Sequence, residues 1–432
     1  MRRKSYHSAV WNSYAVESLV LHFILMMEPM LLHCIKKQIK RCICQKKVAA
    51  TDIPHIKSNT DTRHKTRFYF MEERKIYVSY GKNYTDMVIH LMEKADIASR
   101  IPAGAKVALK PNLVVAHAPE TGATTHGEIL EGVIRYLQQN TIKNIQIIEG
   151  AWVGDSTVRG FSVCGYDKIG AKYGVPLVDL KKDTTTDVDT PIGPIAITDT
   201  ALATDYLINL PVLKGHGQAV MTCALKNCKG CLPDREKRRF HALGLMKPIA
   251  ALASALKPAL TIVDNICGDL NFEEGGTPVQ CDRIMLGFDP VQIDTYGCSL
   301  MGISTGEVPY IELAEKYGAG SMALSPDDII EINKPADATR IEPHTARLAQ
   351  QLAKNVDQRS ACSACFANLV HALYRYSENT GRSYSRPVAI GQEFKDKPFE
   401  GIGIGRCCNC AAKQVQGCPP PAEAILAALM EK

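Results

Sequence analysis

The sequence lacks a long uninterrupted apolar run. The apolar segment 18–35 contains His22, Glu28 and His33, which are costly at bilayer depth, and no small-residue cleavage site follows it. Arg2 and Arg3 are followed by a lysine and a broken apolar region, which does not fit a twin-arginine export signal. We therefore predict no membrane span.

The sequence also lacks a strong charge of one sign. Its 51 Lys/Arg and 45 Asp/Glu give a formal net charge of +6. Residues 1–70 hold thirteen Lys/Arg and four Asp/Glu, so the other 362 residues carry a net charge of −3. This is not the footprint of a nucleic-acid binder. With 46% hydrophobic and 22% charged residues, disordered, collagen-like and coiled-coil chains are excluded.

The usual nucleotide-binding signatures are missing too. There is no Walker A sequence, and no Gly-x-Gly-x-x-Gly lies between a strand and a helix at the first crossover. The glycines at 401, 403 and 405 are followed by Arg406 and Cys407, outside any βαβ unit. A P-loop ATPase and an ordinary Rossmann dehydrogenase are thereby disfavoured, whereas a nucleotide bound in another way is not excluded.

What is present is an α/β pattern that begins at Met71. Short β-branched runs alternate with amphipathic stretches such as 85–100 and 126–139, and Thr125 to Glu128 predicts a capping box at the start of the second. The predicted strands are 75–79, 106–110, 145–149, 177–180, 205–210, 260–264 and 283–288. The sequence thus predicts a layered α/β domain with a mostly parallel sheet and helices.

The chain is long enough for two or three structural units. We assign 1–70 to a basic N-terminal extension, poorly ordered or upstream of the true start at Met71, and 71–335 to the α/β domain. Residues 336–354 form a linker or helix, and 355–432 form a small cysteine-rich C-terminal unit.

Polar residues follow three of the predicted strands, where α/β sheets bind their ligands. The candidate catalytic residues are Lys110, Asn112, Lys214, His216, Lys226 and Asn227. Such a set could hold a small anionic substrate and move a proton. Solvated loop cations and a turn-forming asparagine are the alternative interpretation.

Six of the sixteen cysteines lie in the last 71 residues. Cys362 and Cys365 precede an apolar helical pattern, and a helix start favours the thiolate that binds metal. With Cys407 and Cys418, which precedes two prolines, they form a candidate ligand set for a 4Fe-4S cluster or a structural zinc ion. Cys410 is the alternate ligand, and unpaired structural thiols are the remaining possibility. Cysteine usage indicates a reducing compartment, hence the cytoplasm.

A second cysteine group lies at 223, 228 and 231, with the spacing of a plant-type 2Fe-2S loop. The intervening Lys226 and Asn227 suit a polar pocket better than a cluster-wrapping loop. We favour small buried thiols near the pocket, and a second cluster is the alternative.

Several motifs together resemble the domain-of-unknown-function family 362. They are Leu109-Lys-Pro-Asn-Leu113, Lys214-Gly-His216, Ala224-Leu-Lys-Asn-Cys-Lys-Gly230, Pro233, Arg238-Arg-Phe-His241, Ile262-Val-Asp-Asn265 and Gly287-Phe-Asp-Pro-Val-Gln-Ile-Asp294. The resemblance covers 71–432 and implies an iron–sulfur protein, because the C-terminal Cys-x-x-Cys, Gly-Ile-Gly-x-Cys and Gly-Cys-Pro-Pro pattern resembles the cluster-bearing version. It favours iron–sulfur over zinc and implies no particular reaction.

Three functions fit these features. The first is electron transfer between the cluster and a small anionic substrate or a redox partner protein, with the chain as a possible oxidoreductase. The second is a lyase or isomerase that acts on a carboxylated or phosphorylated small molecule and has a structural cluster. The third is a metal-binding or maturation factor without catalysis.

Overall fold

The computed structural model describes residues 74–336, 338 and 348–431, which all belong to one compact unit. The extension predicted for 1–70 lies outside the described residues. Within them, no helix is both long and apolar enough to cross a membrane.

The larger sheet has the strand order β12-β1-β11-β10-β7-β2-β3-β4. Its strands are β1 (Ile76–Tyr80), β2 (Val107–Pro111), β3 (Ile145–Glu149), β4 (Leu177–Asp179), β7 (Tyr206–Leu210), β10 (Leu260–Asp269), β11 (Pro278–Gly287) and β12 (Ile329–Ile332). Strand β11 runs antiparallel to both β1 and β10, and the other neighbouring pairs are parallel. The predicted mostly parallel α/β sheet is confirmed.

Side chains alternate between two apolar layers along each central strand, as the two-residue period of a strand requires. On β2, Val107 and Leu109 face one layer and Ala108 faces the other. Because both faces are buried, the strands read as continuous apolar runs rather than alternating ones. This burial explains why each predicted strand overlaps a strand of the sheet, although β10 and β11 are longer than predicted and β12 was not predicted.

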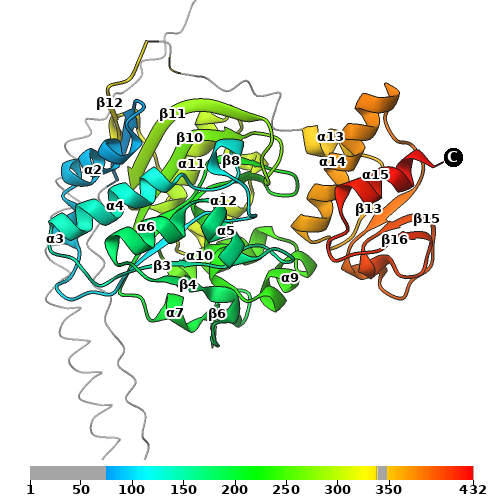
Figure 1. The fold of residues 1–432 in the computed structure, drawn as a ribbon, viewed down its shortest axis with the longest axis horizontal. Coiled ribbons are helices and arrows are strands. Elements are labelled where there is room, and N and C mark those ends of the chain that lie inside the picture. The colour runs from blue at the N-terminus through cyan, green and yellow to red at the C-terminus, as the bar shows by residue number, and fades with distance from the viewer. Residues whose placement is uncertain (1–73, 337, 339–347, 432) are drawn as a thin grey trace, which may run out of the picture. The chain divides into compact units, whose positions relative to one another are not determined.

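Helices cover both faces of this sheet. The layer with Val107 and Leu109 contains α2 (Tyr84–Lys94) and α4 (Gly127–Gln139), which pack side by side (Figure 1). The opposite layer contains α10 (Met246–Leu256), α11 (Pro290–Leu300) and α12 (Tyr310–Lys316). The remaining helices of this region are α3 (Ile97–Arg100), α5 (Thr157–Val163), α6 (Tyr166–Tyr173), α7 (Asp199–Leu202), α8 (Ala224–Asn227) and α9 (Asp234–Ala242).

The predicted capping box at the start of α4 is wrong. The helix has His126 as its N-cap residue, without a side-chain cap. The Thr125 hydroxyl instead donates to the Leu210 carbonyl at 2.7 Å and accepts from the Asn112 backbone N–H at 2.8 Å. A long-range contact therefore replaces the local cap and fixes the segment that follows β2.

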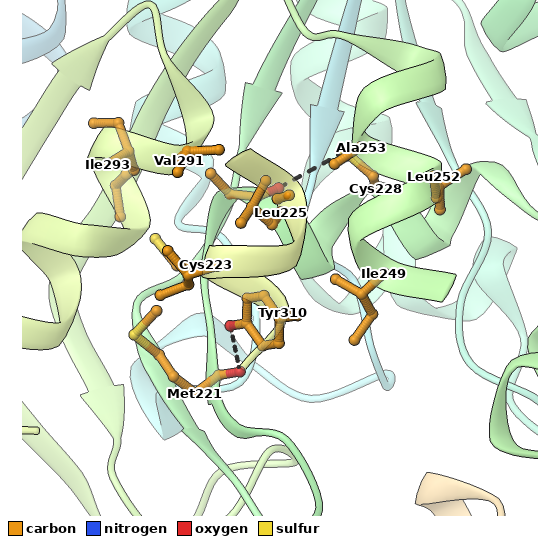
Figure 2. Packing of buried hydrophobic residues seen from close by; sticks show 14 of the residues in the cluster. Met221, Cys223, Leu225, Cys228, Ile249, Leu252, Ala253, Val291, Ile293 and Tyr310 are labelled. Carbon is orange, nitrogen blue, oxygen red and sulfur yellow. Dashed lines mark hydrogen bonds between the residues drawn. The ribbon is translucent and has the colours of Figure 1, made fainter. Parts of the chain in front are cut away.

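Two short antiparallel hairpins lie outside the large sheet: β5 (Thr185–Val188) with β6 (Ile195–Thr198), and β8 (Lys214–His216) with β9 (Val220–Thr222). Helix α8 follows β9 directly. Figure 2 shows Cys223, Leu225 and Cys228 packed among apolar side chains of this core, with the Tyr310 hydroxyl donating to the Met221 carbonyl at 3.0 Å. This packing anchors α8 by one face.

Cys223, Cys228 and Cys231 are all buried in this apolar cluster. The three thiols are thus buried, as the sequence analysis predicted, and the second cluster stays an alternative prediction. Burial raises the pKa of each thiol, for Cys231 to about 12.

The C-terminal region has its own parallel sheet and apolar core. Its strands are β13 (Val356–Gln358), β14 (Val388–Ile390), β15 (Phe399–Ile404) and β16 (Ala411–Val415), joined in that order. Helix α13 (Leu348–Leu352) precedes them, and α14 (Ser363–Thr380) packs against α15 (Ala422–Met430). The core contains Leu369, Ile390, Ile404 and Ile425.

Candidate functional site

A partly open cavity lies where β2 and β3 end, beside α8 and α9. Its polar lining consists of Lys110, Asn112, Glu149, Thr222, Lys226, Asn227, Lys229, Lys237, His241, Glu273, Cys362 and Ser363. Four lysines and two glutamates make the lining net cationic. It lies at the carboxyl edge of parallel strands, the usual ligand position in sheets of this class.

Lys110 and Glu149 form a buried ion pair across the ends of β2 and β3. Lys110 Nζ lies 2.6 Å from Glu149 Oε2, and both side chains are almost fully buried. Burial raises the pKa of Glu149 even though Lys110 opposes the shift. A Cβ on Gly230 would stand 1.8 Å from Glu149 Oε1 and 2.7 Å from Lys110 Nζ. Only glycine leaves room for this pair.

Glu273 is the centre of a second buried network. Its Oε1 lies 2.5 Å from Lys226 Nζ and its Oε2 lies 2.9 Å from His216 Nε2. Burial alone would raise the pKa of Glu273, but His216, Lys226 and Lys214 hold it well below its usual range. Glu273 is therefore a carboxylate despite its burial.

His216 is held in one tautomer. Its Nδ1 accepts the backbone N–H groups of Gln218 and Ala219 at 2.9 and 3.0 Å. The proton of the neutral ring must then lie on Nε2, which donates it to Glu273. Burial lowers the pKa of His216 to about 4, so the ring orients Glu273 without adding a charge.

Lys214 lies behind the same glutamate. Its Nζ donates to the backbone carbonyl oxygens of Ala123 and Glu273 at 2.5 and 2.7 Å. Burial lowers the pKa of Lys214 to about 7. This lysine ties the loop that carries Glu273 to the segment before α4.

Lys229 and Lys237 have weaker anionic partners. Within the described residues, no carboxylate lies within 4 Å of Lys229, whose Nζ is 3.3 Å from His241 Nε2. Lys237 Nζ donates to the Gly150 and Ala151 carbonyls at 2.9 and 2.7 Å. Burial lowers the pKa of Lys237 to about 8, and burial together with the Lys226 charge lowers that of Lys229 to about 7. A bound anion would stabilise both ammonium groups.

Four of the six predicted catalytic candidates, Lys110, Asn112, Lys226 and Asn227, line this one cavity. Lys214 and His216 do not line it and instead position Glu273. Several candidates that were expected in loops after strands lie in regular elements instead. His216 lies on β8, Lys226 and Asn227 lie on α8, and all three are buried. The solvated-loop interpretation of the cations is accordingly wrong for Lys214.

Sequence reasoning missed Glu149, Glu273, Lys237 and His241. Glu149 closes the predicted strand 145–149, so the rule that ligand groups follow strand ends could have found it. His241 and Lys237 come from α9. The sequence does not show which face of this helix packs toward the cavity, so these two residues could not be assigned to it. Glu273 has no signal in the sequence, because its loop between β10 and β11 is shaped by Asp269, which accepts the N–H groups of Asn271, Phe272 and Thr277.

The C-terminal cysteines come from three segments of the second sheet region. Cys362 is the N-cap residue of α14 and Cys365 lies in its first turn, as the helical pattern predicted. Cys407 follows β15, and Cys418 lies between β16 and α15. The open side of Gly405, which has a φ of +88°, faces Cys365 Sγ and the Gly417 carbonyl. The three segments therefore meet around Gly405.

The four thiols influence one another electrostatically. Burial, and then the neighbouring Cys407 and Cys418, raise the pKa of Cys362 to about 11. The pKa of Cys365 is raised by burial and by Cys362, Cys418 and Cys407. Within the described residues, no three His, Cys, Asp or Glu side chains stand close enough to share one metal ion. The ligand set therefore stays a prediction.

The surroundings of these thiols suit an anionic group. Arg238 and Lys229 oppose the rise in the pKa of Cys362, and Lys395, Arg238 and Arg406 oppose that of Cys407. A side-chain N–H of Gln392 donates to Cys362 Sγ at 3.7 Å. Thiolates with nearby cations and an N–H donor are the donor set that an iron–sulfur cluster needs.

Cys408 and Cys410, which crowd the same loop, have different surroundings. Cys408 is buried in a small apolar cluster and its Sγ donates to the Ala389 carbonyl at 3.5 Å. Cys410 is exposed. Neither is among the thiols that raise the pKa of Cys362, whereas Cys408 is among those that raise the pKa of Cys365.

The fold and the site define an α/β protein with a partly open cationic cavity and a cysteine-rich C-terminal region. Residues 107–299 match the family model described as "Domain of unknown function (DUF362)". The chain is 26% identical over 240 residues to a thylakoid-associated protein of Synechocystis sp., a match that covers 52% of this chain and 71% of that protein. The family model thus confirms the resemblance seen in the sequence over residues 107–299.

Two solved structures are also similar in part. The lactate racemase apoprotein of Thermoanaerobacterium thermosaccharolyticum has a TM-score of 0.35 at 14% identity, with 54% of this chain and 59% of that chain covered. A protein from Thermotoga maritima has a TM-score of 0.35 at 11% identity, with 55% and 60% covered. The chain thus spans about three fifths of each structure.

Proposed function

We propose that the chain is a 4Fe-4S protein in which a cationic cavity holds a small anionic substrate, or the anionic group of a redox partner, beside the cluster. The observation that carries the proposal is the position of Cys362. This residue lines the cavity and is electrostatically coupled to the other three candidate cysteines. The anion site and the cysteine group thus share a wall.

Cys362, Cys365, Cys407 and Cys418 would hold the cluster, which supplies one-electron chemistry when bound. The chain's own contribution is electrostatic. Lys229 lines the cavity together with Glu273 and Cys362, and both of these groups oppose the lowering of its pKa. Its charge favours an anion in the cavity and an anionic group at the cysteines.

A non-redox lyase or isomerase is the second candidate, and Glu149 favours it. Its pKa is raised by burial, and it stands beside Lys110 at the cavity wall. A carboxyl group with a raised pKa next to a cation is the arrangement of a general acid or base. In this case the cluster is structural or acts as a Lewis acid, and the substrate is a carboxylated or phosphorylated small molecule.

Anaerobic purification followed by iron, sulfide and zinc analysis tests the first proposal. We expect about four iron and four sulfide per chain, and a visible absorbance that dithionite bleaches reversibly together with a paramagnetic resonance signal. Zinc without iron or sulfide would contradict it. A cluster that dithionite does not reduce, in a protein that binds an anion tightly, would favour the lyase or isomerase.

We also propose a reducing compartment, the cytoplasm. All thirteen cysteines of the described residues are free, including several that are fully buried. Cys residues in oxidising compartments are more often paired. Cell fractionation with an antibody to the chain tests this location.

A further inference from the structure

Three asparagines form a directed hydrogen-bond chain beneath the cavity. Asn209 Nδ2 donates to the Ala224 carbonyl at 2.9 Å, which leaves Asn209 Oδ1 to accept from Asn227 Nδ2 at 2.8 Å. Asn227 Oδ1 then accepts from Asn112 Nδ2 at 2.9 Å. The Ala224 carbonyl can only accept, so each amide in the chain has one possible orientation.

The chain ends on an acceptor without a donor. Asn112 is 7% exposed, and its Oδ1 has no hydrogen-bond partner among the described residues. Turning the amide over would place Nδ2 outward, but it would set two oxygens, Asn112 Oδ1 and Asn227 Oδ1, against each other. A buried acceptor without a partner costs roughly 1–3 kcal/mol, and Asn112 lines the cavity. A ligand is therefore the natural donor.

A second buried polar atom lines the same cavity without a partner. Thr222 is 1% exposed, and its Oγ1 has no hydrogen-bond partner within the described residues. A hydroxyl both donates and accepts, so it can complete the hydrogen bonding of a polar ligand. His241 Nδ1 is a third such atom in the lining. Three buried polar atoms without a partner in one cavity indicate a ligand with hydrogen-bonding groups besides its anion.

The lysines decide which kind of donor the ligand has. Lys110, Lys226, Lys229 and Lys237 all line the cavity, so a protonated amine on the ligand would be repelled. A hydroxyl group donates a hydrogen bond without carrying a positive charge. The anionic part of the ligand is attracted by the net positive charge of this lining, which has four lysines and two glutamates.

We propose that the cavity selects small hydroxylated anions, in which Asn112 Oδ1 accepts the hydrogen bond of the ligand hydroxyl. The anionic group is a carboxylate or a phosphate. This inference rests on the anion-binding cavity of the proposed function and adds the feature by which one anion is preferred over another.

Matched pairs of probes that differ by one hydroxyl test this selectivity: L-malate with succinate, and glycerol 3-phosphate with propyl phosphate. Binding to the full chain, purified anaerobically, is measured by calorimetry at constant ionic strength. We expect the hydroxylated member of at least one pair to bind roughly 3- to 10-fold more tightly, the effect of one hydrogen bond. The pair that shows the preference identifies the carboxylate or the phosphate.

The Asn112→Ala variant should bring this ratio close to one, with the affinity for the hydroxyl-free anion changed by less than about twofold. A purely structural role of Asn112 would instead weaken both members of a pair equally. The matched control is Lys229→Ala, which should weaken both members and keep their ratio. Circular dichroism checks that each variant folds. The affinity ratio of the wild-type chain tests the hydroxyl selectivity by itself, even if a variant does not fold.

Each other outcome overturns a specific statement. Equal affinities within every pair for the wild-type chain overturn the hydroxyl selectivity and leave the anion cavity intact. If the Asn112→Ala variant still prefers the hydroxylated member of a pair, the assignment of this selectivity to Asn112 is wrong. If no probe binds at millimolar concentration, both the selectivity and the anion-binding part of the proposed function are wrong.

Discussion

Replacing Glu273 by glutamine removes the negative charge of a buried network and keeps its shape. The carboxylate lies between Lys226 Nζ at 2.5 Å and His216 Nε2 at 2.9 Å. Because His216 must donate from Nε2, the amide oxygen of the new side chain has to face His216. The amide NH2 group then faces the Lys226 ammonium, donor against donor.

Loss of one member of a buried ion pair costs about 3–5 kcal/mol, because the other charge stays buried without a partner. Lys226 is 5% exposed and Glu273 is 7% exposed, so this range applies. We expect Glu273→Gln to lower the free energy of unfolding by about 3–5 kcal/mol at pH 7. Urea denaturation with an unchanged m-value measures it.

The deficit should shrink as pH rises. Burial already lowers the pKa of Lys226, and loss of the Glu273 charge lowers it further. A lysine whose pKa is depressed in the folded state destabilises the fold below the pKa of the unfolded chain, about 10.4. Glu273→Gln should therefore regain stability between pH 7 and pH 9 relative to the wild type.

Two further variants complete the test. The double variant Glu273→Gln, Lys226→Met removes both charges and should recover most of the loss. Glu131→Gln is the matched control for the same chemical change, since its 2.7 Å partner Lys172 is 62% exposed and exposed pairs contribute less than about 1 kcal/mol. If Glu273→Gln costs no more than Glu131→Gln, the network does not hold a buried charge pair.

Three further predictions concern the cavity floor, pH and metal. Gly230→Ala should lower the free energy of unfolding by about 1–3 kcal/mol and weaken anion binding, because its Cβ would overlap Glu149 Oε1; unchanged binding would contradict this. Burial raises the pKa of Asp294 from 3.8 to about 7. The folded protein therefore binds a proton on Asp294 more tightly than the unfolded chain does, and the free energy of unfolding of the wild type falls as pH rises from about 4 to 7. Denaturation of Asp294→Asn should show a flatter pH dependence over that interval. Single Cys→Ser changes at the four candidate ligands should lower the iron content per chain, and Cys410→Ser should not. If Cys410→Ser loses iron while Cys407→Ser retains it, the wrong thiols were chosen.

The strands of the sheet were predictable because their cause is local. Buried strands need apolar side chains on both faces, and runs such as 145–149 and 206–210 carry that requirement in consecutive residues. The helix start at Cys362 was predictable for the same reason, since an apolar helical period begins next to it. The short hairpin that contains Lys214 and His216 was missed because its strands have three residues each, too few to show a period.

The site was predictable only where it follows directly from strand ends. Lys110 and Asn112 come immediately after an apolar run, so their position at the edge of the sheet could be inferred. The capping box at Thr125 was wrong because a hydrogen bond to the Leu210 carbonyl, 85 residues away, satisfies that hydroxyl instead. Such long-range competition leaves no local pattern in the sequence.

The two glutamates of the cavity decide which of its lysines can contribute to anion binding. Lys110 and Lys226 each have a glutamate at hydrogen-bond distance, so their charges are largely compensated before any ligand binds. Lys229 and Lys237 rely mainly on carbonyl and imidazole groups, and their pKa values are lowered to about 7 and 8. Within 4 Å, Lys229 has no carboxylate among the described residues and Lys237 has only that of Asp234, at 3.8 Å. An arriving anion therefore gains most from these two residues. The affinity of the cavity should therefore depend on Lys229 and Lys237, whereas Lys110 and Lys226 with their glutamates keep it rigid.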